Sequence, residues 1–320
     1  MILVVTAPED VTANLVISAL NDRGANIARV DPADIGHDLV FGACIGDGLP
    51  TWTGRLQTPT RDIALDEIGA VYHRRPTPYT ARFSHLPPQA RDFAATEARF
   101  GLGGILSNLH SAKYVNHPLA VTRADFKPAQ LQMAAACGFS IPPTLITNDT
   151  GKAREFAKEH GSVIYKSFRG APHPTDGNTA AIWTQRINEK DLDESVSVTA
   201  HMFQQEVNKS ADARVTVVGR SVFASRITTP DGSLDWRRGD WSELVHAPIA
   251  VPYEIERALL AYLDGFGLAF GCFDFALEAV GTGGAAERWT FIECNPNGQW
   301  GWLPNSDAIA NAFAYVLMEG

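Results

Sequence analysis

The first third of the chain alternates apolar runs with polar stretches in the order strand, helix, strand. The apolar run 2–6 predicts a buried strand, and Asp10 can cap a helix over 11–22 that ends at Gly24. A second strand is predicted at 26–30, so the chain is expected to open with a β-α-β unit. Three further elements complete this unit: a strand at 70–73, a helix over 88–109 and a strand at 114–116.

Two more units are predicted after the first. The second contains helices over 123–137 and 149–160 and strands at 144–147, 163–166 and 180–185. A polar loop rich in Pro and Gly, 167–178, precedes its last strand and is a candidate flexible lid. From about residue 198, strands alternate with one helix near 252–266, followed by a hairpin and a terminal helix. The predicted fold class is α/β, in three units: an N-terminal β-α-β domain (1–118), a central lid domain (119–197) and a C-terminal mixed-sheet domain (198–320).

Composition limits the classes of partner. The 320 residues are 45% hydrophobic and 20% charged, as in ordinary globular proteins. A net charge of -9 leaves no basic excess to replace phosphate counterions, which argues against a nucleic-acid partner. No apolar run is long enough to span a membrane and no basic leader is present, so we expect a cytoplasmic protein without a membrane partner. Four scattered cysteines fit a reducing compartment: Cys44, Cys137, Cys272 and Cys294.

Hard oxygen ligands interrupt the two apolar strands of the last hairpin. With 281–284 as its turn, one register pairs 276 with 291 and Asp274 with Glu293, and Asn295 then lies on the same face, within roughly 5 Å. Two carboxylates and an amide on one face repel one another unless a cation lies between them. Ligands with oxygen alone select Mg²⁺, Mn²⁺ or Ca²⁺ over Zn²⁺. A hairpin with a polar edge is equally compatible with this pattern.

Two lysines in the middle unit are candidate phosphate ligands. Lys127 lies near the start of a predicted helix, and Lys166 ends a strand directly before the lid-like loop. Together they could neutralise a triphosphate, although each alone could be solvated surface. The extended segment 203–207 follows, and its backbone could bind an adenine edge. Beyond it, Asp212 and Arg214 have the same parity and project from one strand face, unless they form an ordinary surface ion pair.

The order of these motifs resembles the ATP-grasp superfamily over nearly the whole chain. Proteins of that superfamily bind ATP with two lysines and a strand hinge, and bind two magnesium ions with an Asp followed by Glu-x-Asn. The resemblance implies the same roles for the matching positions here: Lys127 and Lys166 for phosphate, the hinge Gln205, Glu206 and Val207 for adenine, and Asp274, Glu293 and Asn295 for metal.

Four further motifs are similar to those of the graspetide synthetases, which include the microviridin-type ligases that macrocyclise ribosomal peptides. The extension after Asn295 discriminates best, because the Asp-x-Arg pair also occurs in glutamate ligases of the superfamily. A long lid containing His and Pro, 171–178, departs from the pattern. The motifs are His73-Arg74-Arg75-Pro76, Lys127 through Gln130-Leu131 to Gly138, Pro142 and Thr144, Lys209-x-x-Asp212-x-Arg214, and Asn295-Pro296-Asn297-Gly298-Gln299-Trp300.

The family resemblance implies a ligase that uses ATP and two Mg²⁺ ions on a ribosomal precursor peptide, with a leader and a core rich in Thr, Asp and Glu. An Asp or Glu side chain of the peptide would attack the γ-phosphate, and a Thr or Ser hydroxyl or a Lys amine of the same peptide would displace phosphate from the acyl phosphate. A homodimer is also expected.

The same resemblance assigns roles to the remaining residues of the substrate site. Arg214 would hold the substrate carboxylate with its planar fork, and Asp212 would orient Arg214 or reach the ribose. Arg226 could point at the γ-phosphate, although a solvated arginine at a strand edge is equally compatible. Lys209 and Arg74 complete the substrate set through their motifs.

Two other functions fit the sequence. One is a ligase that joins a free amino acid to a carboxylate, as the glutamate ligases do. The other is a nucleotide-binding module without turnover, which the intact set of Asp274, Glu293 and Asn295 disfavours. The loop 235–238 could touch substrate, although a solvated turn is the favoured interpretation.

Overall fold

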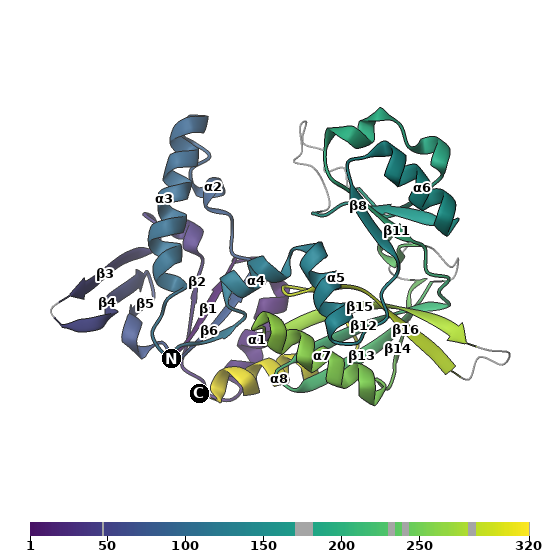
Figure 1. Ribbon diagram of the computed structural model, residues 1–320. Helices are drawn as coiled ribbons and strands as arrows, with labels where there is room; N and C mark the ends of the chain where they lie inside the picture. The colour runs from purple at the N-terminus through teal and green to yellow at the C-terminus, as the bar shows by residue number, and fades with distance from the viewer. Residues whose placement is uncertain (47, 170–181, 230–233, 239–242, 281–285, 320) are drawn as a thin grey trace.

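The computed structural model describes residues 1–46, 48–169, 182–229, 234–238, 243–280 and 286–319. Figure 1 shows an N-terminal body, a central body built on a large sheet, and a smaller body that stands above that sheet. Parallel and antiparallel sheets are combined with helices, so the predicted α/β class is confirmed. The predicted lid at 171–178 and the hairpin turn at 281–284 lie outside the described residues.

The N-terminal body contains a parallel sheet in the order β2-β1-β6-β7. Its strands are β1 (Ile2–Thr6), β2 (Ile27–Val30), β6 (Ala70–Arg74) and β7 (Lys113–Val115). Its helices are α1 (Val11–Asn21), α2 (Tyr79–Arg82) and α3 (Pro88–Leu106), with short 3-10 turns η1 (Pro32–Asp34) and η2 (Leu65–Glu67). The predicted cap of α1 is confirmed, because the carboxylate of Asp10 accepts a hydrogen bond from the Ala13 N–H at 2.9 Å.

A second N-terminal sheet was not predicted from the sequence. It is antiparallel, in the order β3-β4-β5, and its strands are β3 (Val40–Gly46), β4 (Leu49–Thr58) and β5 (Arg61–Ala64). Most of β3 is exposed, and Gly and Thr interrupt the apolar alternation along β3 and β4. The period-2 signal that identifies a strand is therefore weak here.

The predicted helix over 123–137 is two helices, α4 (Pro118–Ala124) and α5 (Lys127–Ala136). Pro128 lies in the first turn of α5, where its missing N–H is harmless, but it cannot continue a helix that arrives from α4. The break makes Lys127 the first residue of a new helix.

The smaller body is a four-stranded antiparallel sheet in the order β10-β9-β11-β8, with helix α6 against it. Strand β11 belongs to this sheet although it follows the boundary proposed at 197/198. The elements are β8 (Thr144–Thr147), α6 (Thr150–His160), β9 (Val163–Lys166), β10 (Gln185–Ile187), η3 (Glu189–Asp191), η4 (Glu194–Val198) and β11 (His201–Gln205).

The large sheet has the order β14-β13-β12-β15-β16. We expected a mixed sheet, but all its described strand pairs are antiparallel, because the strands follow one another through hairpins except where α7 intervenes. Its elements are β12 (Ala211–Val218), β13 (Ser221–Thr228), η5 (Trp236–Arg238), β14 (Val245–Pro248), α7 (Tyr253–Phe266), β15 (Phe270–Val280), β16 (Ala286–Asn295) and the terminal helix α8 (Ser306–Met318).

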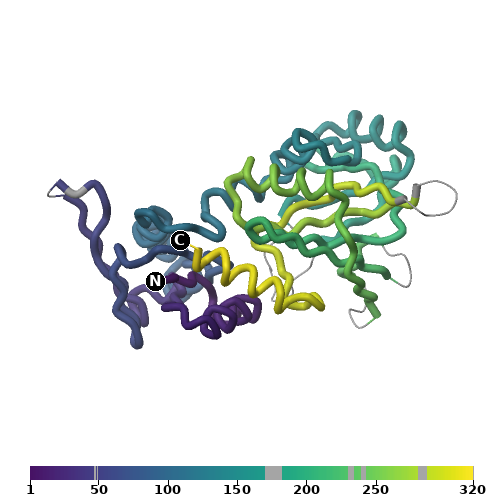
Figure 2. Tube along the Cα trace, turned by 90° about the horizontal axis from the view of Figure 1, so that it is seen from below, coloured from purple at the N-terminus to yellow at the C-terminus, as the bar shows by residue number. Residues whose placement is uncertain are grey.

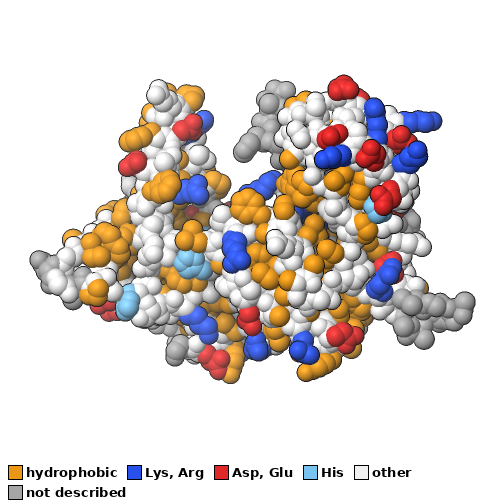
Figure 3. Space-filling model, in the orientation of Figure 1, with side chains coloured by type: hydrophobic (Ala, Val, Ile, Leu, Met, Phe, Trp, Pro, Cys, Tyr) orange, Lys and Arg blue, Asp and Glu red, His pale blue; other side chains and the backbone are white. Residues whose placement is uncertain are grey.

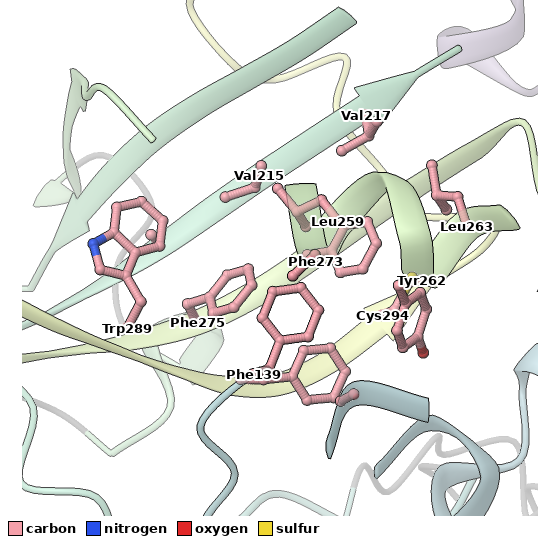
Figure 4. Packing of buried hydrophobic residues seen from close by; sticks show 14 of the residues in the cluster. Phe139, Val215, Val217, Leu259, Tyr262, Leu263, Phe273, Phe275, Trp289 and Cys294 are labelled. Carbon is pink, nitrogen blue, oxygen red and sulfur yellow. The ribbon is translucent and has the colours of Figure 1, made fainter. Parts of the chain in front are cut away.

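Two hydrophobic cores hold the large sheet in place. One lies between the sheet, α5 and α7, where Phe139, Tyr262, Phe273, Phe275 and Phe291 pack ring against ring (Figure 4). The other joins the large sheet to the N-terminal body through α8, which lies against α1 (Figure 2). The face of the sheet opposite α7 and the ends of β1 and β6 are thereby held at fixed positions around one site.

Candidate functional site

The three predicted metal ligands lie together on the β15–β16 hairpin. Asp274 pairs with Glu293, as predicted. The side-chain amide of Asn295 lies 3.3 Å from Asp274 Oδ2 and 3.3 Å from Glu293 Oε1. The side chains are largely buried, so their charges act in a medium of low dielectric constant.

A β-bulge in this hairpin determines which side chains face the site. The predicted pairing of 276 with 291 is wrong: Phe275 pairs with Phe291, because Ile292 is an extra residue between the pairs at Phe291 and Glu293. Both Ile292 and Glu293 consequently line the cavity, while Phe291 turns into the core. The bulge thus separates a core position from a polar position that simple alternation would place on the same face.

The two predicted phosphate lysines converge on Glu293. Lys127 Nζ lies 2.5 Å from Glu293 Oε2. Gln130 fixes this geometry, because its side chain bonds to both the N–H and the C=O of Cys294 and so joins α5 to β16. Lys166, at the end of β9, has a long contact of 3.4 Å to the side chain of Gln204.

Burial and charge shift the pKa values of these groups in different directions. Burial lowers the pKa of Lys166 to about 8, and the like charges of Lys127 and Arg237 add to that effect. Burial alone would raise the pKa of Glu293, but Lys127, Lys166 and Arg237 outweigh it and hold the pKa of this carboxyl well below its usual range. Glu293 is therefore an anion, and three cationic side chains share its negative charge: Lys127, Lys166 and Arg237.

The predicted adenine hinge lies where β11 leaves the small sheet. The Gln205 N–H donates to the Pro143 carbonyl and the Glu206 N–H to the Ser162 carbonyl, each at 2.9 Å. Within the described residues the Val207 N–H has no such partner. The hinge therefore offers one open backbone donor, at Val207, which lines a small cavity beside the hairpin.

The carboxylate of Glu206 is directed elsewhere. It forms a bidentate pair with Arg186, at 2.6 and 2.8 Å, and accepts from the Ser162 hydroxyl. Its side chain is absent from the described linings of the two cavities at the hairpin. Only the backbone of Glu206 can serve the hinge.

The motif around Arg214 forms two separate ion pairs. Lys209 contacts both carboxylate oxygens of Asp212, at 2.6 and 2.8 Å. Arg214 Nη1 contacts both oxygens of Asp274 at 2.8 Å, and Nη2 donates to the Gln299 carbonyl. The expectation that Asp212 orients Arg214 is therefore wrong for this conformation, because Lys209 takes its carboxylate. Burial raises the pKa of Asp212 to about 6, despite Lys209.

Arg74, which we expected in the substrate site, is buried and contacts other residues of the protein, and its substrate role stays a prediction. It is 1% exposed, its Nε pairs with Asp10, and its remaining nitrogens donate to the Gly298 carbonyl at 3.0 Å and to the side chain of Gln299 at 2.8 Å. Thr12 of α1 donates to the same Gln299 oxygen. Arg74 thus fixes the loop after Asn295 and joins it to the N-terminal body.

Arg226 also lies away from the predicted phosphate site. Its Nη1 pairs with Glu287 at 2.6 and 2.8 Å, and Nη2 lies 3.5 Å from the Ser210 hydroxyl. It lines neither cavity at the hairpin within the described part of the chain. A role at the γ-phosphate is not supported by this conformation, because a carboxylate already holds the side chain at the far end of β16.

The loop 235–238 belongs to the site, so the interpretation as a solvated turn is wrong. Asp235 and Trp236 are buried, and Asp235 forms a fork with Arg237 at 2.8 and 2.9 Å. Arg237 Nη1 lies 3.5 Å from Glu293 Oε1. Trp236 packs on Trp302 and anchors the loop. The Asp-x-Arg spacing of this loop repeats that of 212–214, a signal that could have indicated it.

These residues surround a cavity of about 400 Å³ between the small body and the large sheet. A second cavity of about 70 Å³ continues toward the hinge and Asp212. Figure 3 shows a notch between α3 and the small body, with Lys and Arg side chains near its floor. The larger cavity is lined by Asp125, Lys127, Lys166, Arg237, Glu293 and Asn295 among others.

The donor set fits a hard divalent cation shared with a phosphate ligand. It supplies carboxylate and amide oxygens without a thiol or imidazole, as Mg²⁺ prefers. Within the described residues no group of three His, Cys, Asp or Glu side chains is placed to hold a metal, and this set has two carboxylates and one amide. In this structure Glu293 pairs with Lys127 and Asp274 pairs with Arg214. Because the set offers only two carboxylates and one amide, phosphate oxygens would have to complete the coordination of a cation.

The chain is similar to known proteins in sequence and in fold. Residues 1–122 match the family model described as the MvdD pre-ATP grasp domain. The fold is similar to a RiPP-associated ATP-grasp ligase from Chryseobacterium gregarium in complex with ADP and a leader and core peptide, with 27% identity, a TM-score of 0.88, and coverage of 99% of this chain and 96% of that chain.

Two further similarities extend the comparison. The macrocyclase MdnC of Microcystis aeruginosa, bound with the precursor peptide MdnA, is 27% identical, with a TM-score of 0.86 and coverage of 99% of both chains. A glutathione synthetase from Synechocystis is 28% identical over 108 residues, which are 34% of this chain and 28% of that protein. The chain therefore matches about a quarter of that relative's length.

Among the described helices, none has the length and apolar character that crossing a bilayer requires.

Proposed function

This chain is an ATP-grasp ligase of the graspetide-synthetase type, and from that premise we propose that it closes rings in a ribosomal precursor peptide. In the proposed reaction a side-chain carboxylate of an Asp or Glu of the peptide attacks the γ-phosphate of ATP, which releases ADP and forms an acyl phosphate. A Thr or Ser hydroxyl or a Lys amine of the same peptide then attacks the acyl carbon. Phosphate leaves, and an ester or an amide cross-link remains.

The observation that carries this proposal is the convergence of Asp274, Glu293 and Asn295 with Lys127 and Lys166 on one cavity. Phosphoryl transfer needs little covalent chemistry from a protein and depends on positioning and charge neutralisation. Two Mg²⁺ ions held by the oxygen set would neutralise charge on the transferring phosphoryl group. The proposed route needs no covalent intermediate on the enzyme.

The other site residues bind and orient in this proposal. The open N–H of Val207 would bind the adenine edge, and Lys166 would bind the phosphates through its charged form. Asp212, with its raised pKa, would accept the proton that the attacking hydroxyl loses, after exchanging its contact with Lys209. Arg237 would shift from Glu293 toward phosphate oxygens when cations take the carboxylate.

Partner and location complete the proposal. We propose a precursor with a leader and a core rich in Thr, Asp and Glu, and a homodimeric cytoplasmic enzyme. We propose three domains, 1–118, 119–197 and 198–320, with the second extended past 197 to include β11. The similarity to peptide-bound ligases supports the class of partner.

Mass spectrometry of the product tests the proposal. The chain is incubated with ATP, Mg²⁺ and a candidate precursor peptide encoded beside its gene. Each ring should make the peptide lighter by the mass of one water, because both reacting groups belong to the same molecule. The same incubation without ATP is the control. An unchanged precursor mass with ATP would contradict the proposal.

A free amino-acid ligase is the second candidate, and the partial similarity to a glutathione synthetase favours it. In that case the carboxylate substrate gains the mass of an added amino acid less one water. The same experiment, repeated with a mixture of free amino acids, distinguishes the two functions by the sign of the mass change.

A further inference from the structure

Arg75 has an unusual backbone conformation at the end of β6. Its φ angle is +40°, in the left-handed region, and Ser111 is the other described residue besides glycine with a positive φ. A long side chain in that region strains the backbone, and such strain persists where the surrounding structure imposes it, often at ligand sites. The adjoining contacts of Arg74 with the 297–299 loop impose it here.

Arg75 also differs from the other arginines of the site in its contacts. Arg74 pairs with Asp10, Arg214 with Asp274, and Arg237 with Asp235. Arg75 is exposed, and within the described residues its side chain has no hydrogen bond and no ion pair. Its planar fork of donors is therefore open to an anion, whereas the fork of Arg214 is occupied.

Arg75 follows Arg74, which contacts the same loop, 298–299, as Arg214. Arg74 donates to the Gly298 carbonyl, and Arg214 donates to the carbonyl of the next residue, Gln299. Partial burial lowers the pKa of Arg75, and the positive charges of Arg74 and Arg214 lower it further. The charge of Arg75 also acts on Asp125 at the rim of the larger cavity. An anion beside Arg75 would relieve this repulsion between like charges.

We propose that Arg75 is a substrate-binding residue that receives the side-chain carboxylate of the substrate before its phosphorylation. The inference rests on the proposed function, because it assigns the carboxylate of the acidic peptide to a residue of the same site. Arg75 supplies two parallel N–H donors to the carboxylate, and Arg214 stays with Asp274. In this backbone conformation the Arg75 side chain stays exposed, while Asp10 is taken by the neighbouring Arg74.

Kinetics of three variants test this role. Arg75→Gly removes the fork and suits a φ of +40°, Arg75→Lys keeps the charge without the fork, and Arg99→Gln removes an exposed arginine of α3 as the control. Arg75→Gly should raise the KM for the precursor about 10- to 100-fold, the range for a hydrogen bond to a charged group, with Arg75→Lys between it and the unmodified protein. The KM for ATP should not change.

Thermal unfolding separates this role from a structural one. Arg75→Gly should have the same thermal midpoint as the unmodified protein or a higher one, because glycine relieves the strained conformation. A lowered midpoint with an unchanged KM for the precursor would overturn the inference, and so would a raised KM for ATP.

Chemical labelling tests the inference without turnover. Phenylglyoxal modifies open guanidinium groups, so Arg75 should react faster than Arg74 and Arg214 in the full chain. A synthetic peptide rich in Thr, Asp and Glu should slow the labelling of Arg75, and the same peptide with Asn and Gln in place of the acids should not. Equal protection by both peptides, or by neither, would overturn the inference. An absence of ring product with Arg75 still protected would instead count against the proposed function alone.

Discussion

At the scale of single residues, the site is a set of acid-base pairs in close contact. In each pair the carboxylate is largely buried. The pairs are Glu293 with Lys127, Asp274 with Arg214, Asp212 with Lys209 and Asp235 with Arg237. Transferring charged groups from water into the protein costs desolvation free energy. A buried ion pair is therefore weak evidence that the pair stabilises the fold. We infer that these pairs hold the side chains ready for ligands, which exchange partners with them when nucleotide and cations bind.

Glu293→Gln should abolish ATP-dependent product formation and leave the fold intact. The substitution removes a charged oxygen ligand and preserves the shape of the side chain. The measurement is turnover as a function of Mg²⁺ concentration, with circular dichroism to monitor the fold. Glu278→Gln on the neighbouring strand, whose carboxylate pairs with Arg288, is the matched control and should retain turnover. Normal turnover of Glu293→Gln at limiting Mg²⁺ would remove the metal assignment.

ATP affinity should decrease as the pH rises above about 8. The pKa of Lys166 without ligand is about 8, so the lysine loses its charge above that pH, while bound phosphates would raise its pKa. ATP binding should then take up a proton, and its dissociation constant should increase by up to about tenfold per pH unit above that pH. Titration calorimetry in buffers of different ionisation enthalpy measures the uptake. A Lys166→Met variant with the same pH dependence would exclude Lys166 as the source.

The titration of Lys166 also makes the stability of the fold depend on pH. Because its pKa is lowered on folding, stability increases with pH, whereas a lysine whose pKa is raised by a partner would make stability decrease with pH. The folded pKa of Lys166 lies below its usual value, so the unfolded chain binds more protons between about pH 8 and 10.5. The contribution of this group to the free energy of unfolding therefore increases with pH across that window.

At the scale of secondary structure, the site depends on irregularities at the ends of regular elements. The bulge at Ile292 directs two consecutive side chains of β16 to the cavity, and the break before Lys127 starts a helix at the proposed phosphate site. The hinge after Gln205 ends the ladder of β11 and leaves one N–H open. Each irregularity frees a polar group that a continuous element would bury or pair.

Val207→Pro should raise the KM for ATP. Proline removes the only hinge N–H that lacks a backbone partner within the described residues, and one hydrogen bond is worth about 0.5–1.5 kcal/mol. Val207→Ala keeps this donor and should have a small effect. Nucleotide affinity of both variants, measured by calorimetry, checks the expectation. Equal affinities for the proline variant and the unmodified protein would place adenine elsewhere.

At the scale of the whole molecule, the N-terminal body and the large sheet share one core. Helix α8 follows the β15–β16 hairpin in the chain and packs with α1 and β6. Its Phe313 is fully buried and contacts Tyr72, Phe270 and Trp300, with ring centroids 5.2, 4.8 and 5.3 Å away. The small body has its own core around Ala153, Val163 and Phe203. Arg74 and Gln299 can therefore meet at the site because α8 holds the two larger bodies together.

Phe313→Ala should destabilise both larger bodies at once. Truncation of a buried phenylalanine typically lowers the free energy of unfolding by about 3–5 kcal/mol. Denaturation followed by tryptophan fluorescence and by circular dichroism should give coincident transitions for these bodies, at lower denaturant than in the unmodified protein. Tyr315→Ala, an exposed residue of the same helix, is the control. Separate transitions for the two bodies would show that the shared core does not couple them.

The local patterns of the chain were sufficient for most of the regular elements and for the juxtaposition of Asp274, Glu293 and Asn295. The run 2–6, the cap at Asp10 and the facing of Asp274 and Glu293 depend on neighbours in the sequence or on a single hairpin. Hydrophobic periodicity and cap chemistry act over such short distances. The sheet β3-β4-β5 escaped prediction because its exposed strands lack a regular period.

The sequence by itself determined which residues are candidates for the chemistry, and only the tertiary structure decided how they are paired. Whether Arg74 or Arg75 is buried, and where Arg226 points, depend on elements more than fifty residues apart in the chain or on a backbone angle that no pattern encodes. Asp212 contacts its local neighbour Lys209, because Arg214 pairs with Asp274 on another strand. The bulge at Ile292 is of the same kind, because an extra residue in a strand becomes visible only when its partner strand is in place. Contacts between distant segments are selected by packing of the whole molecule, in which a buried charge accepts whichever partner the fold brings within reach.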